Sequence, residues 1–345
     1  MNTYITINYV LLAIVFTFLF VEGMSAISFI YDRKSLPKVK KYLDPVWGIV
    51  GTFVVFFVVN TEVLYPSIMP AIDYLYVFPI LLATLLFIGR NVFLVFSEYI
   101  WKDSKFSQLM LARVYSLITF IIIIILLSIF ISIISGVGTN ATLTGLSTSV
   151  FLSNPYVLGF IVGTLLIAFG LSFVFYKIEK MNVLSPISTV LGLFLFVFSI
   201  SHLGLNVNYL TYILAAAIAA VSIFYYMTGK ARREIIFIVA FLSVISINFL
   251  NYGKVFGTQS LTSYLNNSAV ASAGILVTIV GGFLLTAMLI FFLYMYKLPE
   301  KENSSYDYEE SSDEDEKVGI ANLYIIPNNN KVNGKEHKAG KDRKR

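Results

Sequence analysis

The sequence predicts an all-α polytopic membrane protein with nine transmembrane helices. Nine long apolar stretches interrupt the chain, each close to the roughly 20 residues that a helix needs to cross the hydrocarbon core. The chain is 57% hydrophobic and only 13% charged, which excludes a soluble domain because a water-exposed surface of this size needs far more charge. Lys and Arg fall almost entirely in alternate gaps, a pattern typical of a fixed orientation in a membrane.

The nine stretches are similar in length and separated by polar gaps. They lie near residues 7–31, 47–65, 71–96, 111–137, 155–176, 183–203, 207–228, 234–252 and 271–296. The first lacks a basic leading segment and a small-residue cleavage site, so we expect it to be a retained helix and not a signal peptide.

The distribution of basic residues predicts the orientation. The gap at 32–46 and the gaps after the third, fifth and seventh stretches carry most of the Lys and Arg, whereas the opposite gaps hold only Lys254. By the positive-inside rule, the amino terminus lies outside and the carboxyl terminus in the cytoplasm. We expect a multi-pass protein of the plasma membrane.

The loops divide the chain into four parts. Residues 1–137 form a first four-helix bundle, 138–252 an outer loop and a second bundle, and 253–296 an outer loop and the ninth helix. Residues 297–345 are rich in both acidic and basic side chains and cannot bury enough apolar surface to offset the entropy of ordering. The sequence therefore predicts a disordered cytoplasmic tail, either merely solvated or docking a partner or lipid surface.

Two N-x-S/T sequons, at Asn140 and Asn266, fall in predicted outer loops. Both are candidate glycosylation acceptors if the organism has the machinery.

Cofactor ligands are scarce. The chain has no Cys and only two His, His202 and His337, which excludes thiolate metal sites and disulfides. A haem held by two histidines of the membrane helices is excluded, because only His202 lies in an apolar stretch. Haem held by His with Met or Lys stays open, but the composition favours a chain that binds no haem iron and no other metal. No basic stripe with interleaved aromatic residues points to nucleic acid.

Two ionisable residues lie deep in predicted helices. Glu22 lies past the middle of the first stretch and Arg90 about two-thirds along the third, which runs in the same direction. Their similar depth predicts a pair, because charges in hydrocarbon usually face the bundle interior. The pair either carries protons or contacts substrate, or it merely holds two helices together.

Small residues predict where helices approach closely. Gly159 and Gly163 form a G-x-x-x-G pattern, which favours close packing in lipid. We expect this contact within the chain, with an intersubunit contact as the alternative. His202, at the outer end of its stretch, is expected to be an interfacial hydrogen-bonding residue, with a ligand role as the alternative.

Four segments carry a family resemblance. They are Val21-Glu22-Gly23-Met24, Asp44-Pro45-Val46-Trp47, the run from Leu81 to Phe93 that contains Arg90, and the helix entry Asn154-Pro155-Tyr156-Val157-Leu158-Gly159. In their order and spacing, the first 180 residues resemble subunit II of the cytochrome bd quinol oxidases. The resemblance implies two four-helix bundles plus one extra helix, and it marks Glu22, Gly23, Trp47, Arg90, Asn154 and Pro155 as family-motif positions.

The chain departs from the family at three positions. Glu22 stands for the usual Asp and Met24 for an aromatic residue. Gly48 replaces an Asp that the family associates with a polar proton path. The segment 181–296 resembles the family only in its topology.

The resemblance implies a function as well as a fold. In this family subunit I binds the b- and d-type haems and the quinol, whereas subunit II is haem-poor. We therefore expect a non-catalytic subunit that supports assembly and oxygen or proton access, binds no cofactor alone except a structural quinone, and partners a haem-binding subunit I and the lipid membrane. The alternative is a secondary transporter, for which Pro79 and Pro186 would break two helices. A scaffold unrelated to respiration is the third reading.

Overall fold

The computed structural model describes residues 2–27, 36–96, 105–140, 142–178, 182–230 and 233–295. The described residues belong to one compact unit, Met1–Tyr296. The tail expected to be disordered lies outside the described residues.

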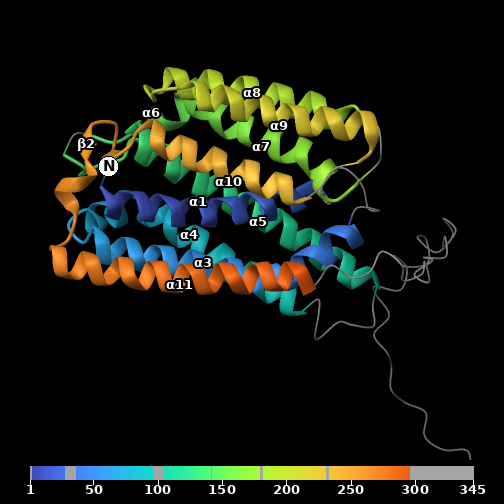
Figure 1. Ribbon diagram of the computed structural model, residues 1–345, viewed down its shortest axis with the longest axis horizontal. Coiled ribbons are helices and arrows are strands. Elements are labelled where there is room, and N and C mark those ends of the chain that lie inside the picture. Colours follow the sequence, from blue (N-terminus) through green and yellow to red (C-terminus); the bar gives the residue numbers. More distant parts are fainter. Residues whose placement is uncertain are drawn as a thin grey trace, which may run out of the picture. The chain divides into compact units, whose positions relative to one another are not determined.

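The described part of the chain is all-α, with one long helix in each of the nine apolar stretches (Figure 1). The helices are α1 (Thr3–Gly23), α3 (Leu36–Leu64), α4 (Met69–Val95), α5 (Lys105–Ser135), α7 (Pro155–Phe175), α8 (Leu184–His202), α9 (Tyr209–Thr228), α10 (Arg233–Leu250) and α11 (Ser268–Met295). Short helices η1 (Met24–Ala26), α6 (Thr148–Ser153) and η4 (Leu261–Tyr264) join them. The predicted fold class is confirmed.

Seven of these helices, within the described residues, are long and apolar enough to cross a membrane. The other two have shorter apolar parts, Val50–Leu64 in α3 and Glu234–Leu250 in α10. Helix α3 begins eleven residues before its predicted apolar stretch. The prediction omitted these first turns because they carry Lys residues, and the apolar residues follow only later. Hydropathy therefore placed the spans, and polar extensions lengthen the helices beyond them.

Polar caps set several helix boundaries. Asn2, Asn154 and Asn208 cap α1, α7 and α9, each accepting backbone N–H groups that the first helical turn leaves free. Helix α9 ends at Gly229, whose φ of 63° lies in the left-handed region that glycine adopts without strain.

Pro79 bends α4, whereas Pro186 does not break α8. Tyr76 has non-helical angles (φ −113°, ψ 19°) three residues before Pro79, where the proline ring crowds the preceding turn. Pro186 lies in the first turn of α8, where its missing N–H would have no partner in any case. The break at Pro186 that the transporter alternative would require is therefore not present in α8.

Helices α7 and α8 pack closely through facing glycines. A Cβ added to Gly163 would lie 2.8 Å from the Gly192 carbonyl oxygen, and one added to Gly192 would lie 2.7 Å from that of Gly163. Gly159 likewise faces Ser199 of α8. The predicted G-x-x-x-G contact is thus made within the chain. In lipid, the hydrophobic effect does not drive helices together, so close van der Waals packing of this kind stabilises their contact.

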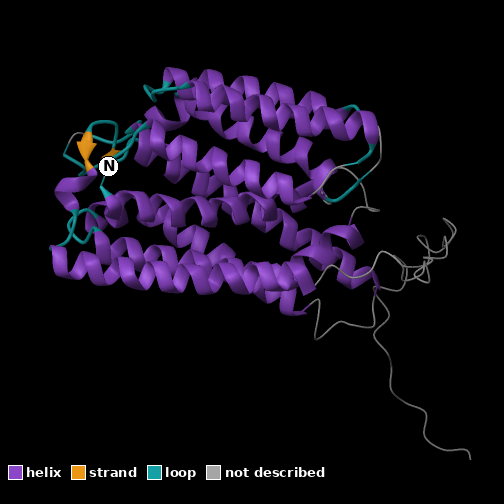
Figure 2. Ribbon diagram, in the orientation of Figure 1, coloured by secondary structure: helices purple, strands orange, loops and turns teal. Residues whose placement is uncertain are grey.

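Helix α1 lies among helices from both halves of the sequence. It contacts α3, α5 and α11 as well as α7 and α10, and α11 packs along α3 (Figure 1). A small two-stranded hairpin, β1 (Lys254–Val255) with β2 (Gln259–Ser260), follows α10 (Figure 2). The amide of Phe256 in its turn donates to the Ile133 carbonyl at 2.6 Å, which satisfies a free carbonyl at the end of α5.

Candidate functional site

Helices α1 and α4 bring Glu22 and Arg90 into direct contact. Arg90 Nη1 donates to Glu22 Oε2 at 2.6 Å, and both side chains are 0% exposed. The two residues lie in apolar helices, where an unpaired charge would be costly. The similar depth of the two residues in the sequence predicted a pair, and the two side chains are in contact in the structure.

Aromatic rings complete the surroundings of Arg90. Its guanidinium carbon lies 4.3 Å from the ring centroid of Phe87, one turn earlier in α4, and 5.4 Å from that of Tyr115 in α5. Both distances fall within the range of cation–π attraction. Arg90 therefore links three helices: α4 by its backbone, α1 by the ion pair and α5 by a ring.

The ion pair leaves part of its hydrogen-bonding capacity unused. Among the described residues, Glu22 Oε1 and Arg90 Nε and Nη2 are buried without a hydrogen-bond partner. Buried polar atoms of this kind are ordinarily satisfied by water or a further polar group. The pair can thus act as a fixed cross-link, or as one end of a longer polar connection.

The other family-motif positions serve local structure. Gly23 ends α1, and a Cβ there would lie 2.5 Å from Ile123 Cδ1 of α5, so a larger residue would require the Ile123 side chain to move. Asn154 accepts from the amides of Tyr156 (2.9 Å) and Val157, and Pro155 follows as the first residue of α7. Trp47 lies in α3, but its side chain is outside the described part.

The side chains of both sequon asparagines form hydrogen bonds, Asn140 at an exposed position and Asn266 at a half-buried one. Asn140 Oδ1 accepts from the amide of Thr144 at 2.9 Å, and its Nδ2 donates to the Thr144 hydroxyl. Asn266 Nδ2 donates to the carbonyl of Val63 at 3.0 Å. Each amide thus fixes a loop, and glycosylation at either stays a prediction.

His202 contacts neighbouring aromatic rings at the end of α8. Its Nδ1 is 2.8 Å from the Phe198 carbonyl oxygen and donates a hydrogen bond to it. The ring also stacks on Tyr156, with centroids 4.6 Å apart and planes 13° apart. These contacts join α7 to α8, and the position of His202 at the membrane interface stays a prediction. Among the described residues, no three His, Cys, Asp or Glu side chains come together as metal ligands.

A buried amide network was missed by the sequence reasoning. Asn60 of α3 donates through Nδ2 to Asn8 Oδ1 of α1 at 3.1 Å and accepts a hydrogen bond from the hydroxyl of Thr278 of α11. All three side chains are buried. The signal that points to it is an Asn side chain within an apolar stretch, which is costly in lipid unless it forms a hydrogen bond with a neighbouring helix.

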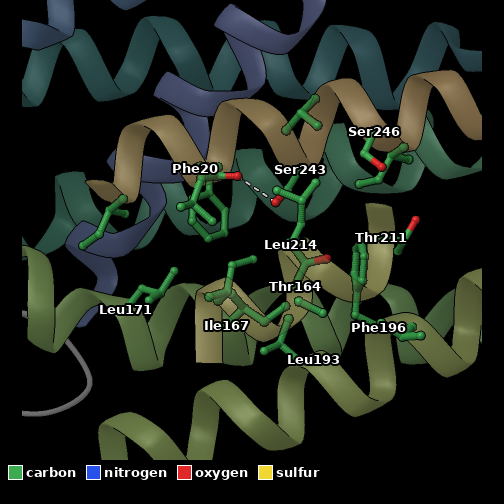
Figure 3. Close-up of a pocket in the computed structure, with 18 of the residues that line it drawn as sticks. Phe20, Thr164, Ile167, Leu171, Leu193, Phe196, Thr211, Leu214, Ser243 and Ser246 are labelled. Atoms are coloured by element: carbon green, nitrogen blue, oxygen red, sulfur yellow. Dashed lines mark hydrogen bonds between the residues drawn. The ribbon is translucent and has the colours of Figure 1, made fainter. Parts of the chain in front are cut away.

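Two apolar hollows lie on either side of Phe20 and Thr164. One, of about 310 Å³, is a crevice between α1, α5 and α7. The other, of about 100 Å³, lies between α7, α8, α9 and α10 (Figure 3).

The expected structural quinone does not fit either hollow. A quinone head group carries two carbonyl acceptors. The one hydroxyl that lines the larger crevice, on Thr164, already donates to the Phe160 carbonyl at 2.8 Å. The smaller cavity has too little room for a ring and its tail.

Comparison with known proteins gives an informative structural match. No protein-family model matches this chain, and no curated protein matches it. A solved structure, that of a bd oxidase from Geobacillus thermodenitrificans, is similar with a TM-score of 0.66 and 17% sequence identity. The similarity covers 86% of this chain and 99% of that chain. At this identity the two chains share a fold.

Proposed function

We propose that this chain is a non-catalytic, haem-poor membrane subunit, similar to subunit II, of a cytochrome bd-type quinol oxidase. The observation that carries the proposal is the shared fold, which extends over 99% of a chain from a bd oxidase. A likeness of that extent favours a subunit of such a complex over a protein that shares only a helical hairpin or one bundle.

The motif positions support the same proposal. Two of the family-motif residues, Glu22 and Arg90, contact each other in the structure. Asn154 and Pro155 begin α7 as cap and first residue. In this proposal the haems and the quinol are held by a partner subunit I, and this chain passes no electrons.

For the ion pair, the geometry favours a structural role in assembly. Arg90 contacts α1 and α5 as well as its own helix, so the pair fixes the relative position of three helices. A subunit that must present a defined surface to its partner needs such fixed points. A proton-carrying role for Glu22 is the alternative, and the activity of Glu22→Gln distinguishes the two roles.

The transporter reading is not favoured. Transporters of this kind place their substrate beside a pair of broken helices in corresponding halves. Here α4 is bent at Tyr76, but α8 runs unbroken from Leu184 to His202.

Native purification tests the proposed function. The chain, tagged in its own organism, is extracted in a mild detergent, and its absorption spectrum and quinol oxidation are measured. We expect a haem protein to copurify in a fixed ratio, with b-type and d-type bands, while the chain expressed alone carries no stoichiometric haem. An unrelated membrane protein with the same tag is the control. Copurification without any haem protein, or stoichiometric haem in the isolated chain, would overturn the proposal.

A further inference from the structure

The cavity between α7, α8, α9 and α10 has a volume of about 100 Å³. Phe20 of α1 closes one side, and side chains such as Leu193 and Leu214 point into it (Figure 3). None of the residues that line it is classed as exposed. It is therefore lined entirely by buried and half-buried side chains.

Its wall is apolar except for four hydroxyl side chains, those of Thr164, Thr211, Ser243 and Ser246. Three of them donate to acceptors of their own helix or its cap. The Ser243 hydroxyl, for example, donates to the Val239 carbonyl at 2.7 Å, as the dashed line in Figure 3 marks. Their donor capacity is therefore used within the protein.

Ser246 is different. It is only 3% exposed, and its hydroxyl has no hydrogen-bond partner among the described residues. Water is a poor occupant beside it, because a buried water needs two to four polar partners and the rest of the wall is largely apolar. A dry cavity would leave the hydroxyl unsatisfied, which is unfavourable.

We propose that this cavity binds a small, largely apolar molecule with a single hydroxyl or carbonyl oxygen, to which Ser246 donates a hydrogen bond. Its size limits the ligand, since an engineered apolar cavity of about 150 Å³ holds benzene or xenon. The occupant is then the size of a short-chain alcohol. The apolar wall supplies most of the affinity, and Ser246 selects for the oxygen.

Two probes of different polarity test the site on the full-length chain, purified with any partner subunit that it retains. Trifluoroethanol at low millimolar concentration is followed by fluorine NMR, and xenon, which cannot form a hydrogen bond, by xenon NMR. We expect both to bind saturably. In Ser246→Ala, trifluoroethanol should bind roughly fivefold more weakly, the usual effect of one hydrogen bond. Xenon binding should not change.

Filling variants provide the second arm. Ala240→Leu, on the α10 wall, should abolish saturable binding of both probes. Ala215→Leu, on the α9 wall, should have the same effect and replaces the first variant if that one does not fold. Ile238→Leu, on the exposed face of α10, is the matched control and should change neither. Circular dichroism and elution profile check the fold. The proposal is overturned if either probe binds in linear proportion to its concentration, without saturation. It is also overturned if trifluoroethanol binds Ser246→Ala as tightly as the unmodified chain, or if both probes still bind the filled variants.

Discussion

Arg90 donates to Glu22 across 68 positions of sequence, with Nη1 2.6 Å from Oε2 and both side chains fully buried. The contact joins α4 to α1 at a depth where neither charge reaches water. Three polar atoms of the pair have no hydrogen-bond partner among the described residues. The charge of each residue is therefore compensated mainly by the charge of the other.

Removing one member of this pair should cost more than removing both. Glu22→Gln or Arg90→Ala leaves an uncompensated buried group, a change that destabilises proteins by roughly 3–5 kcal/mol. Each should reduce the yield of assembled complex, whereas Glu22→Gln combined with Arg90→Met should recover part of it. Yield is measured by quantitative purification in mild detergent.

The same variants separate a structural from a proton-carrying role. If Glu22 carries protons, Glu22→Gln should leave assembly intact and slow turnover, because Gln keeps the shape but cannot release a proton. Full yield with full activity in both single variants would exclude both roles.

Closer packing cannot be tolerated where α7 meets α8. Gly163→Ala should lower the unfolding temperature markedly, because the new methyl would lie 2.8 Å from a backbone oxygen and a backbone nitrogen of α8. Overpacking of this kind typically costs about 1–3 kcal/mol. Thermal unfolding in detergent measures the difference.

Gly282→Ala is the matched control for that substitution. A Cβ at Gly282 of α11 meets nothing within 4 Å, so alanine there should be neutral or stabilising by up to about 1 kcal/mol, the difference in helix propensity. Equal effects at the two positions would contradict the assigned packing.

Asn60 should hold α11 against α1 and α3. Asn60→Leu removes hydrogen bonds to Asn8 and Thr278, and each such bond between membrane helices contributes roughly 0.6–2 kcal/mol. We expect a lower unfolding temperature and faster proteolysis before α11. Thr84→Val, which removes an exposed hydroxyl bonded only to the Ile80 carbonyl of its own helix, is the control and should have little effect.

The orientation can be tested with single cysteines, because the chain contains none. Cys at Thr144, an exposed position of the loop before α6, should react with an impermeant maleimide added to intact cells. Cys at Ser304, in the tail, should react only after permeabilisation. The reverse pattern would invert the topology assigned from the basic residues.

The sequence by itself determined that the helices of this protein lie in lipid, and where along the chain those helices are located. Transfer of an apolar segment into lipid depends mainly on the composition of that segment, so nine stretches could be assigned one at a time, and all nine are helices. The same local reasoning predicted that glycines of α7 approach another helix, and the similar depth of Glu22 and Arg90.

Only the tertiary structure decided which faces meet. In lipid the outer and inner faces of a helix are both apolar, so the periodicity that reveals the buried face of a soluble helix is weak here. The sequence therefore did not indicate that Asn60 faces Thr278, that Gly163 meets Gly192, or that four helices leave a cavity beside Ser246. Those contacts depend on how each helix is rotated about its axis, which is a property of the packed bundle and not of any one segment.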